Sequence, residues 1–80
     1  MGFAKTEGEI AERTSAFLKA EIKKAEITYA ELAERMKKHG HKDESENTVK
    51  QKLKRGTFPA TWFLAALAAL ELKGVRLEDI

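Results

Sequence analysis

The chain has 80 residues, no cysteine and a formal net charge of +2. This length limits it to one small domain with a modest core, and the lack of cysteine excludes disulfides and thiolate metal sites. No run reaches the roughly 20 apolar residues of a membrane span and no secretory signal pattern opens the chain, so we expect a cytoplasmic protein outside membranes.

The first predicted helix covers residues 7–26, after a segment, residues 1–6, that we expect to be disordered. One stripe at helical spacing contains Ile10, Phe17, Leu18, Ile22 and Ala25, with Thr14 on the same stripe. The opposite face is charged. The pattern predicts an amphipathic helix that covers one side of a core and has no chemical role.

The second predicted helix has the best-marked start in the chain. Thr28 is a good N-cap and Glu31 follows three residues later, which predicts a capping box. Ile27 and Leu32 are placed to form a hydrophobic staple across this cap. The inner face is expected to consist of Ala30, Leu32, Ala33 and Met36. We expect the helix to reach His39, with Gly40 as a left-handed C-cap.

The third predicted helix covers residues 45–55, after a polar connection at residues 41–46, and stops at Gly56. Either Ser45 or Asp43 is suited to cap it. Val49 and Leu53 are expected to point inward. The outward face then holds Asn47, Gln51, Lys54 and Arg55, with Thr48 beside them and Lys50 and Lys52 at the flanks. From residue 48 to residue 55 every charged side chain is basic, which is the electrostatic pattern typical of a nucleic-acid binder.

The fourth predicted helix covers residues 60–72, with Pro59 suited to its first turn. It is apolar nearly all round, which indicates burial on more than one side. We expect its central residues to be Phe63, Leu64, Leu67 and Leu70. Phe58, Trp62 and Phe63 fit a core better than a stacking platform for single-stranded nucleic acid. In the tail, residues 73–80, Val75 and Leu77 alternate with Arg76 as in a short extended segment.

The third helix has the side chains that read DNA in the major groove. Asparagine and glutamine pair bidentately with adenine, and arginine or lysine pairs with guanine. Flanking lysines and the N-terminus of the second helix are suited to hold phosphates. The alternative interpretation is an ordinary solvated face on a short helix, since exposed charged faces are common.

Three stretches of the sequence, ITYAELAERM, ENTVKQKLKRG and PATWFLAALAAL, resemble the phage-repressor (Cro-like) helix-turn-helix superfamily. Within it, the chain is similar to a family of small bacterial domains of unknown function, in which a helix like SAFLKAEIKKAEI precedes TYAELAERM. The resemblance extends from about Thr14 to the tail. It implies a helical bundle, sequence-specific DNA binding and a role in regulating transcription. The connection HGHKDESE is longer than the tight turn of that superfamily, and its acids Asp43, Glu44 and Glu46 would oppose binding if they faced DNA.

These observations together predict an all-α fold, a compact four-helix bundle of the repressor-like helix-turn-helix type with a short C-terminal tail. We expect one domain over residues 1–80, with the helix-turn-helix unit at residues 28–55. The predicted function is sequence-specific binding of double-stranded DNA by a small bacterial transcriptional regulator. The predicted base contacts are Asn47, Thr48, Gln51 and Arg55, and the predicted backbone contacts are Thr28, Tyr29, Lys50, Lys52 and Lys54.

A protein-interaction module on the same fold, without DNA binding, is the alternative function. Because one small domain has a small footprint on DNA, tight binding would need a dimer or a partner protein. The candidate contacts for a homodimer are the helix at residues 60–72 and the tail.

Metal binding and catalysis have little support in the sequence. His39 and His41 lie near Asp43 and Glu44, but their spacing matches no familiar ligand pair, and we interpret this segment as a solvated loop. Neither Ser15 nor Ser45 has an evident histidine and carboxylate partner set, and the glycines form no phosphate-binding loop. We therefore expect no enzyme activity, no metal and no cofactor.

Overall fold

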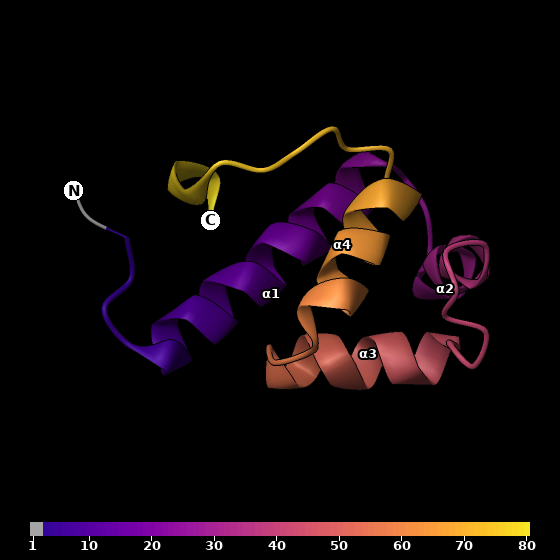
Figure 1. Ribbon diagram of the computed structural model, residues 1–80, viewed down its shortest axis with the longest axis horizontal. Coiled ribbons are helices and arrows are strands. Elements are labelled where there is room, and N and C mark those ends of the chain that lie inside the picture. The colour runs from indigo at the N-terminus through magenta and orange to yellow at the C-terminus, as the bar shows by residue number, and fades with distance from the viewer. Residues whose placement is uncertain (1–2) are drawn as a thin grey trace.

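The computed structural model describes residues 3–80, and over this range the fold is all-helical (Figure 1). Four α-helices follow one another: α1 (Glu7–Lys24), α2 (Tyr29–Lys37), α3 (Glu46–Arg55) and α4 (Ala60–Ala69). A short 3-10 helix, η1 (Leu77–Asp79), lies in the tail. The predicted all-α class and the four predicted helices are therefore confirmed.

The helices enclose one hydrophobic core. Helix α2 packs against both α3 and α4, and α1 packs against α3. The largest fully buried side chains come from all four helices, and they are Leu18, Leu32, Met36, Val49, Leu53 and Trp62. Burying a side chain of this size contributes about 1.5–3 kcal/mol relative to its exposure, so this single core holds the helices together.

Helix α1 begins where the sequence predicts, but its apolar stripe is only partly buried. Thr6 caps the helix, its Oγ1 accepting a hydrogen bond from the N–H of Glu9 at 3.1 Å. Leu18 and Ile22 are buried, whereas Ile10 is 37% exposed and Ala25 is exposed. The first turn of α1 extends beyond the other helices (Figure 1), which leaves Ile10 partly uncovered. Within the segment expected to be disordered, residues 3–6 are described and irregular, while Met1 and Gly2 lie outside the described residues.

Helices α1, α2 and α4 end earlier than the sequence predicts. Helix α2 ends at Lys37 rather than His39, because the N–H groups of His39 and His41 both turn back to the carbonyl of Met36. Gly40 does adopt a positive φ of 95°, but in the turn after the helix. Helices α1 and α4 stop where Glu26 and Glu71 take left-handed conformations, with φ of 57° and 61°.

Two inner-face predictions are wrong, and the tail differs from its predicted form. Leu64, expected at the centre, is 62% exposed, because Trp62 directs the opposite side of α4 into the core. Ala30, expected on the inner face of α2, is exposed. In the tail, Arg76 has the extended backbone that the sequence predicts, with φ of −100° and ψ of 143°, but Leu77 begins η1. The tail turns back over α1 (Figure 1), where Asp79 and Ile80 line one groove together with Ala16, Phe17 and Ala20.

Candidate nucleic-acid interface

Helix α3 is defined sharply at both ends. At its start, Ser45 Oγ accepts from the N–H of Thr48 at 3.2 Å, and Thr48 Oγ1 accepts from the N–H of Ser45 at 2.8 Å. This reciprocal capping box makes Ser45, one of the two predicted candidates, the N-cap. At its end, Gly56 takes the left-handed conformation with φ of 74°, and its N–H donates to the carbonyl of Lys52.

Two contacts fix the C-terminal end of α3 against α1. The buried hydroxyl of Ser15 donates a hydrogen bond to the backbone carbonyl of Leu53, which lies in the last turn, where carbonyls have no partner within the helix. Gly56 lies so close to α1 that a Cβ atom would stand 2.6 Å from the carbonyl oxygen of Ala11. Helix α3 is therefore held at a fixed position relative to α1.

The inner face of α3 is as predicted, and it determines which residues point outward. Val49 and Leu53 are 0% and 1% exposed. On the opposite side, Asn47, Gln51 and Lys54 follow one another at helical spacing and are all exposed. Lys50 and Arg55, also exposed, stand on either side of this stripe. We call these five residues the α3 outer face.

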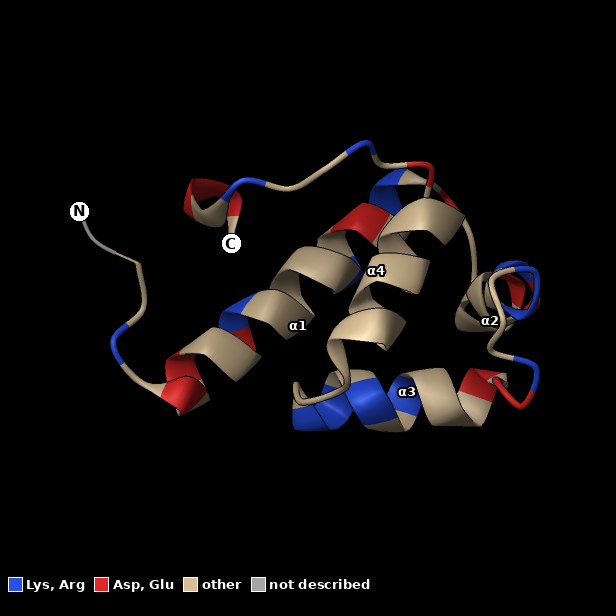
Figure 2. Cartoon of the chain, in the orientation of Figure 1, with Lys and Arg blue, Asp and Glu red and all other residues tan. Residues whose placement is uncertain are grey.

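The cations of the α3 outer face lie toward its C-terminal end. Figure 2 shows Lys and Arg clustered there, on a helix that forms one edge of the molecule. Glu46 is the only acid within α3 and stands in its first turn, where a negative charge is favourable to the helix dipole. The outer face beyond that turn is therefore basic and amide-bearing without an acidic side chain.

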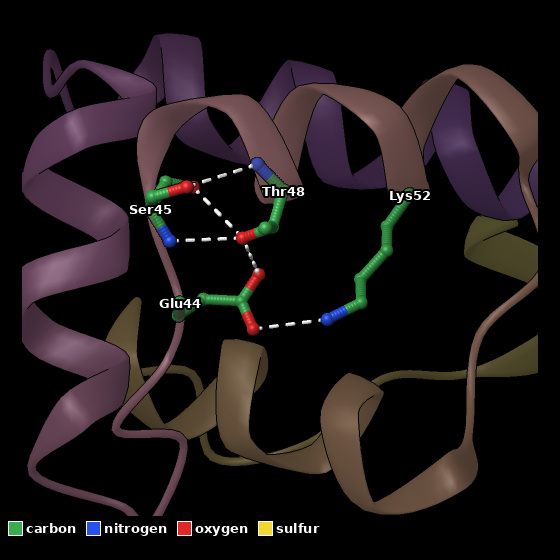
Figure 3. A network of polar contacts seen from close by, with 4 residues as sticks. All are labelled: Glu44, Ser45, Thr48 and Lys52. Carbon is green, nitrogen blue, oxygen red and sulfur yellow. Dashed lines mark hydrogen bonds and ion pairs between the residues drawn. The ribbon is translucent and has the colours of Figure 1, made fainter.

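Glu44, one of the acids that would oppose binding if they faced DNA, is buried. It is 5% exposed, and its carboxylate accepts a hydrogen bond from the Thr48 hydroxyl at 2.7 Å and from the Lys52 ammonium at 2.9 Å (Figure 3). The same ammonium lies 5.3 Å from the centre of the Trp62 ring, within the range of a cation–π contact. This network joins the α2–α3 connection, α3 and α4.

The network keeps Glu44 charged. Burial raises the pKa of this carboxyl group, but hydrogen bonds from Thr48 and Lys52, the Lys52 charge and the nearby Trp62 indole together hold the pKa below its ordinary value. Nε1 of Trp62 is itself buried and has no hydrogen-bond partner among residues 3–80. The Glu44–Lys52 pair is thus neutral as a unit, and the Glu44 charge is withheld from the surface.

The predicted base contacts divide into two groups in the structure. Asn47, Gln51 and Arg55 are exposed on the α3 outer face. Thr48 is only partly exposed, and its hydroxyl is already bonded to Glu44 and to the N–H of Ser45. Thr48 therefore serves the helix cap and the Glu44 network.

The predicted backbone contacts also divide. Lys50 and Lys54 are exposed, whereas Lys52 turns toward the core edge and pairs with Glu44, its side chain 24% exposed. Thr28 is exposed and forms the predicted capping box of α2, its Oγ1 3.1 Å from the N–H of Glu31. Tyr29 packs partly buried against the core. A phosphate contact by Lys52 would have to break its pair with Glu44.

Three partnerships around the site were missed by the sequence reasoning. Glu44, Thr48 and Lys52 are spaced by four residues each, which was a usable signal that they share one side of α3. The Ser15–Leu53 bond had no local signal, because the two residues are far apart in sequence. The guanidinium of Arg35 makes the third contact, donating to the carbonyl of Ala69 at 3.1 Å and so tying α2 to the end of α4.

Among residues 3–80, no three His, Asp or Glu side chains are grouped in a way that could hold a metal ion. Over the same range, no helix combines the length and apolar character of a membrane span.

Comparison with known proteins gives one match. Residues 10–75 match a family described as "Domain of unknown function (DUF6471)". The match includes nearly all of α1 and the whole of α2, α3 and α4. No curated protein and no solved structure matches the chain.

Proposed function

Because the chain belongs to the family described as Domain of unknown function (DUF6471), whose name assigns no activity, we propose its function from the α3 outer face. We propose that the protein binds double-stranded DNA, with α2 and α3 as a helix-turn-helix and α3 in the major groove. Sequence-specific binding by so small a domain suits a transcriptional regulator.

The observation that carries this proposal is the composition of the α3 outer face. Asn47 and Gln51 are exposed on one stripe, with Lys54 next along it. Amides at such positions pair bidentately with adenine, and Arg55 supplies a donor pair for guanine. A helix face whose only role is solubility does not require two neighbouring amide side chains on one stripe.

The cations around this stripe supply the second part of the interface. Lys50 and Lys54 are exposed on α3 and can reach phosphates on either side of a groove. Thr28, at the exposed N-terminus of α2, stands where unpaired backbone N–H groups favour an anion. These contacts would position α3 without reading sequence.

The burial of Glu44 supports the same conclusion. An exposed carboxylate beside the phosphates would repel DNA, but Glu44 is paired with Lys52 inside the domain. The resemblance of ITYAELAERM and ENTVKQKLKRG to the Cro-like superfamily also favours DNA binding. We rank Asn47, Gln51 and Arg55 as the base contacts, ahead of Thr48, whose hydroxyl is occupied.

The test is fluorescence anisotropy of a labelled random-sequence duplex, titrated with protein at low salt and then near physiological salt. We expect binding that weakens with salt at a log–log slope of about −0.9 for each phosphate neutralised. The double variant Gln51→Ala, Arg55→Ala should bind the random duplex more weakly, because one positive charge is lost from the α3 outer face, and should not select a preferred sequence from a random pool.

The matched control is Lys73→Ala, which removes one exposed positive charge from the tail, on the side of the molecule opposite α3 (Figure 1). It should bind as the unchanged protein does. The absence of binding by the unchanged protein at low salt would overturn the proposal. Equal losses in the control and the double variant would show attraction by net charge alone.

A further inference from the structure

The outward side of α4 is an uncharged surface with an exposed leucine. No charged residue occurs between Ala60 and Ala69. Leu64 is 62% exposed and lies on the side of α4 opposite Trp62. No other element crosses in front of α4 in Figure 1. Because only one side of α4 is buried in the core, the other, apolar side faces solvent.

The neighbours of Leu64 on this face are small. Ala60, Thr61 and Ala68 are three or four residues away from Leu64 and are all exposed, so they form one surface with it. Small side chains let the backbone of another helix come close, and a leucine fits over an alanine better than over a second leucine. The face therefore has a projecting side chain, Leu64, and a shallow position at Ala68, over which the leucine of another helix can pack.

The two ends of α4 differ in whether a charged side chain stabilises the partial charge of the helix dipole. At the C-terminal end, the guanidinium of Arg35 donates to the carbonyl of Ala69. At the N-terminal end, Pro59 is the N-cap, without a side-chain hydrogen bond or an acid in the first turn. Helix N-termini favour a negative charge. Glu71, just after α4, is exposed and forms no ion pair with any residue of the described chain.

We propose that this face binds the same face of a second copy of the chain, with the two α4 helices antiparallel about a two-fold axis at the height of Ala66, whose own side chain is buried on the opposite side of the helix. In this arrangement Leu64 of each copy lies over Ala68 of the other. The same register brings Glu71 of each copy, two residues beyond the end of α4, close to Thr61 of the other, because this pair is also centred on Ala66. Each uncomplemented N-terminus thereby receives a carboxylate, and this charge complementarity is why we choose a second copy as the occupant.

The size of the surface sets the expected strength. Stable interfaces bury about 800 Å² on each partner, and one face of a ten-residue helix provides less than that. We therefore expect a weak dimer that forms as the protein concentration rises. The inference does not rest on DNA binding, and it is tested without DNA.

The first experiment is sedimentation equilibrium of the full chain from micromolar to millimolar concentration. We expect a reversible monomer–dimer equilibrium that Leu64→Lys shifts to monomer at all these concentrations. Leu77→Lys is the control, because Leu77 is equally exposed, at 65%, but lies in the tail. Circular dichroism should show the same helix content in both variants, since neither side chain belongs to the core.

A charge exchange tests the register. Glu71→Lys should weaken the dimer by placing a cation at each N-terminus, and Thr61→Glu should weaken it by setting two carboxylates opposite each other. The double variant, Thr61→Glu with Glu71→Lys, should restore dimerisation, because each new glutamate then faces a new lysine.

Three results would overturn the proposal. The first is a monomer at every concentration, which would leave the α4 face to a different protein. The second is loss of the dimer in Leu77→Lys but not in Leu64→Lys, which would place the interface on the tail. The third is additive weakening in the double charge variant.

Discussion

At the scale of single residues, Gly56 is the position with the least tolerance for change. Its left-handed φ costs other residues about 1–2 kcal/mol, and a Cβ there would collide with the backbone of Ala11 at 2.6 Å. The collision is with a carbonyl group, so no side-chain movement can relieve it. Gly56 therefore fixes how closely α1 approaches the end of α3.

The variant Gly56→Ala should lose about 2–4 kcal/mol of the free energy of unfolding, measured by urea denaturation, from backbone strain and displacement of α1. Gly40→Ala is the matched control, because Gly40 also has a positive φ but a Cβ there would meet no atom within 4 Å. It should lose only about 1–2 kcal/mol. Equal losses in the two variants would show that the contact with Ala11 has no energetic effect.

Glu44 gives the domain a pH-dependent contribution to stability. Its pKa is lowered in the folded state, so the unfolded chain takes up a proton at a higher pH than the folded chain does. The stabilisation is fully present above the ordinary pKa of 4.5 and is lost as the pH falls below it through the folded pKa.

We expect Glu44→Gln to destabilise the domain by about 1–3 kcal/mol at pH 7, because Lys52 loses its charged partner. The difference between the variant and the unchanged protein should shrink at pH 3, because below the ordinary pKa of 4.5 the unfolded chain takes up a proton at Glu44 more readily than the folded chain does. Urea denaturation at the two pH values measures this. A difference that stays constant with pH would contradict the role assigned to the Glu44 charge.

At the scale of elements, the start of α3 depends on side-chain hydroxyls as well as on its apolar face. Thr48 accepts from the N–H of Ser45 and donates to Glu44, so one hydroxyl joins the helix cap to the buried carboxylate. Val has nearly the same shape without the hydroxyl. Thr48→Val should therefore lower the free energy of unfolding by about 1–3 kcal/mol.

DNA sequence preference separates this structural role of Thr48 from the predicted base contact. If Thr48 serves only the helix cap, Thr48→Val should bind the same preferred sequence as the unchanged protein once both are folded. Asn47→Ala, on the exposed stripe, should do the opposite, leaving stability within about 0.5 kcal/mol and relaxing the preference. A changed preference in Thr48→Val would return Thr48 to the set of base contacts.

The helix boundaries show which features could be predicted from the sequence and which could not. The starts of α2 and α3 were predictable because Thr28 and Ser45 are local capping signals. The ends of α1 and α4 were not, because each closes at a glutamate in a left-handed conformation where glycine is the usual signal. The stripe of α3 was predictable from Val49 and Leu53. The spacing of Glu44, Thr48 and Lys52 was a signal that they come together, but only the structure shows that Glu44 is buried there.

At the scale of the whole molecule, one core links all four helices, so unfolding should be cooperative. Trp62, the single tryptophan, is 1% exposed and reports on the packing of α4, whereas far-UV circular dichroism reports on every helix. The two signals should give the same denaturation midpoint in urea, as two-state unfolding requires. An earlier midpoint for Trp62 fluorescence would show that α4 separates from the other helices first.

The exposure of Leu64 was hidden from the sequence for a reason that also belongs to the whole molecule. Helix α4 is apolar on every side, so periodicity cannot tell which side faces the core. The choice depends on where α2 and α3 leave room for the Trp62 ring. Only the assembled fold shows that one apolar side of α4 is left over.

Glu26, in a left-handed conformation at the end of α1, is a position at which a substitution can raise the stability of the domain. Glu26 is exposed, and the N–H of Ile27 closes the helix end by bonding to the carbonyl of Ile22. Glycine adopts this conformation without the strain that a side chain brings. Glu26→Gly should therefore raise the melting temperature by a few degrees, for a gain of about 0.5–1 kcal/mol. Because Glu26 lies outside both proposed interfaces, the Glu26→Gly protein is a more stable host in which destabilising substitutions can still be produced and measured.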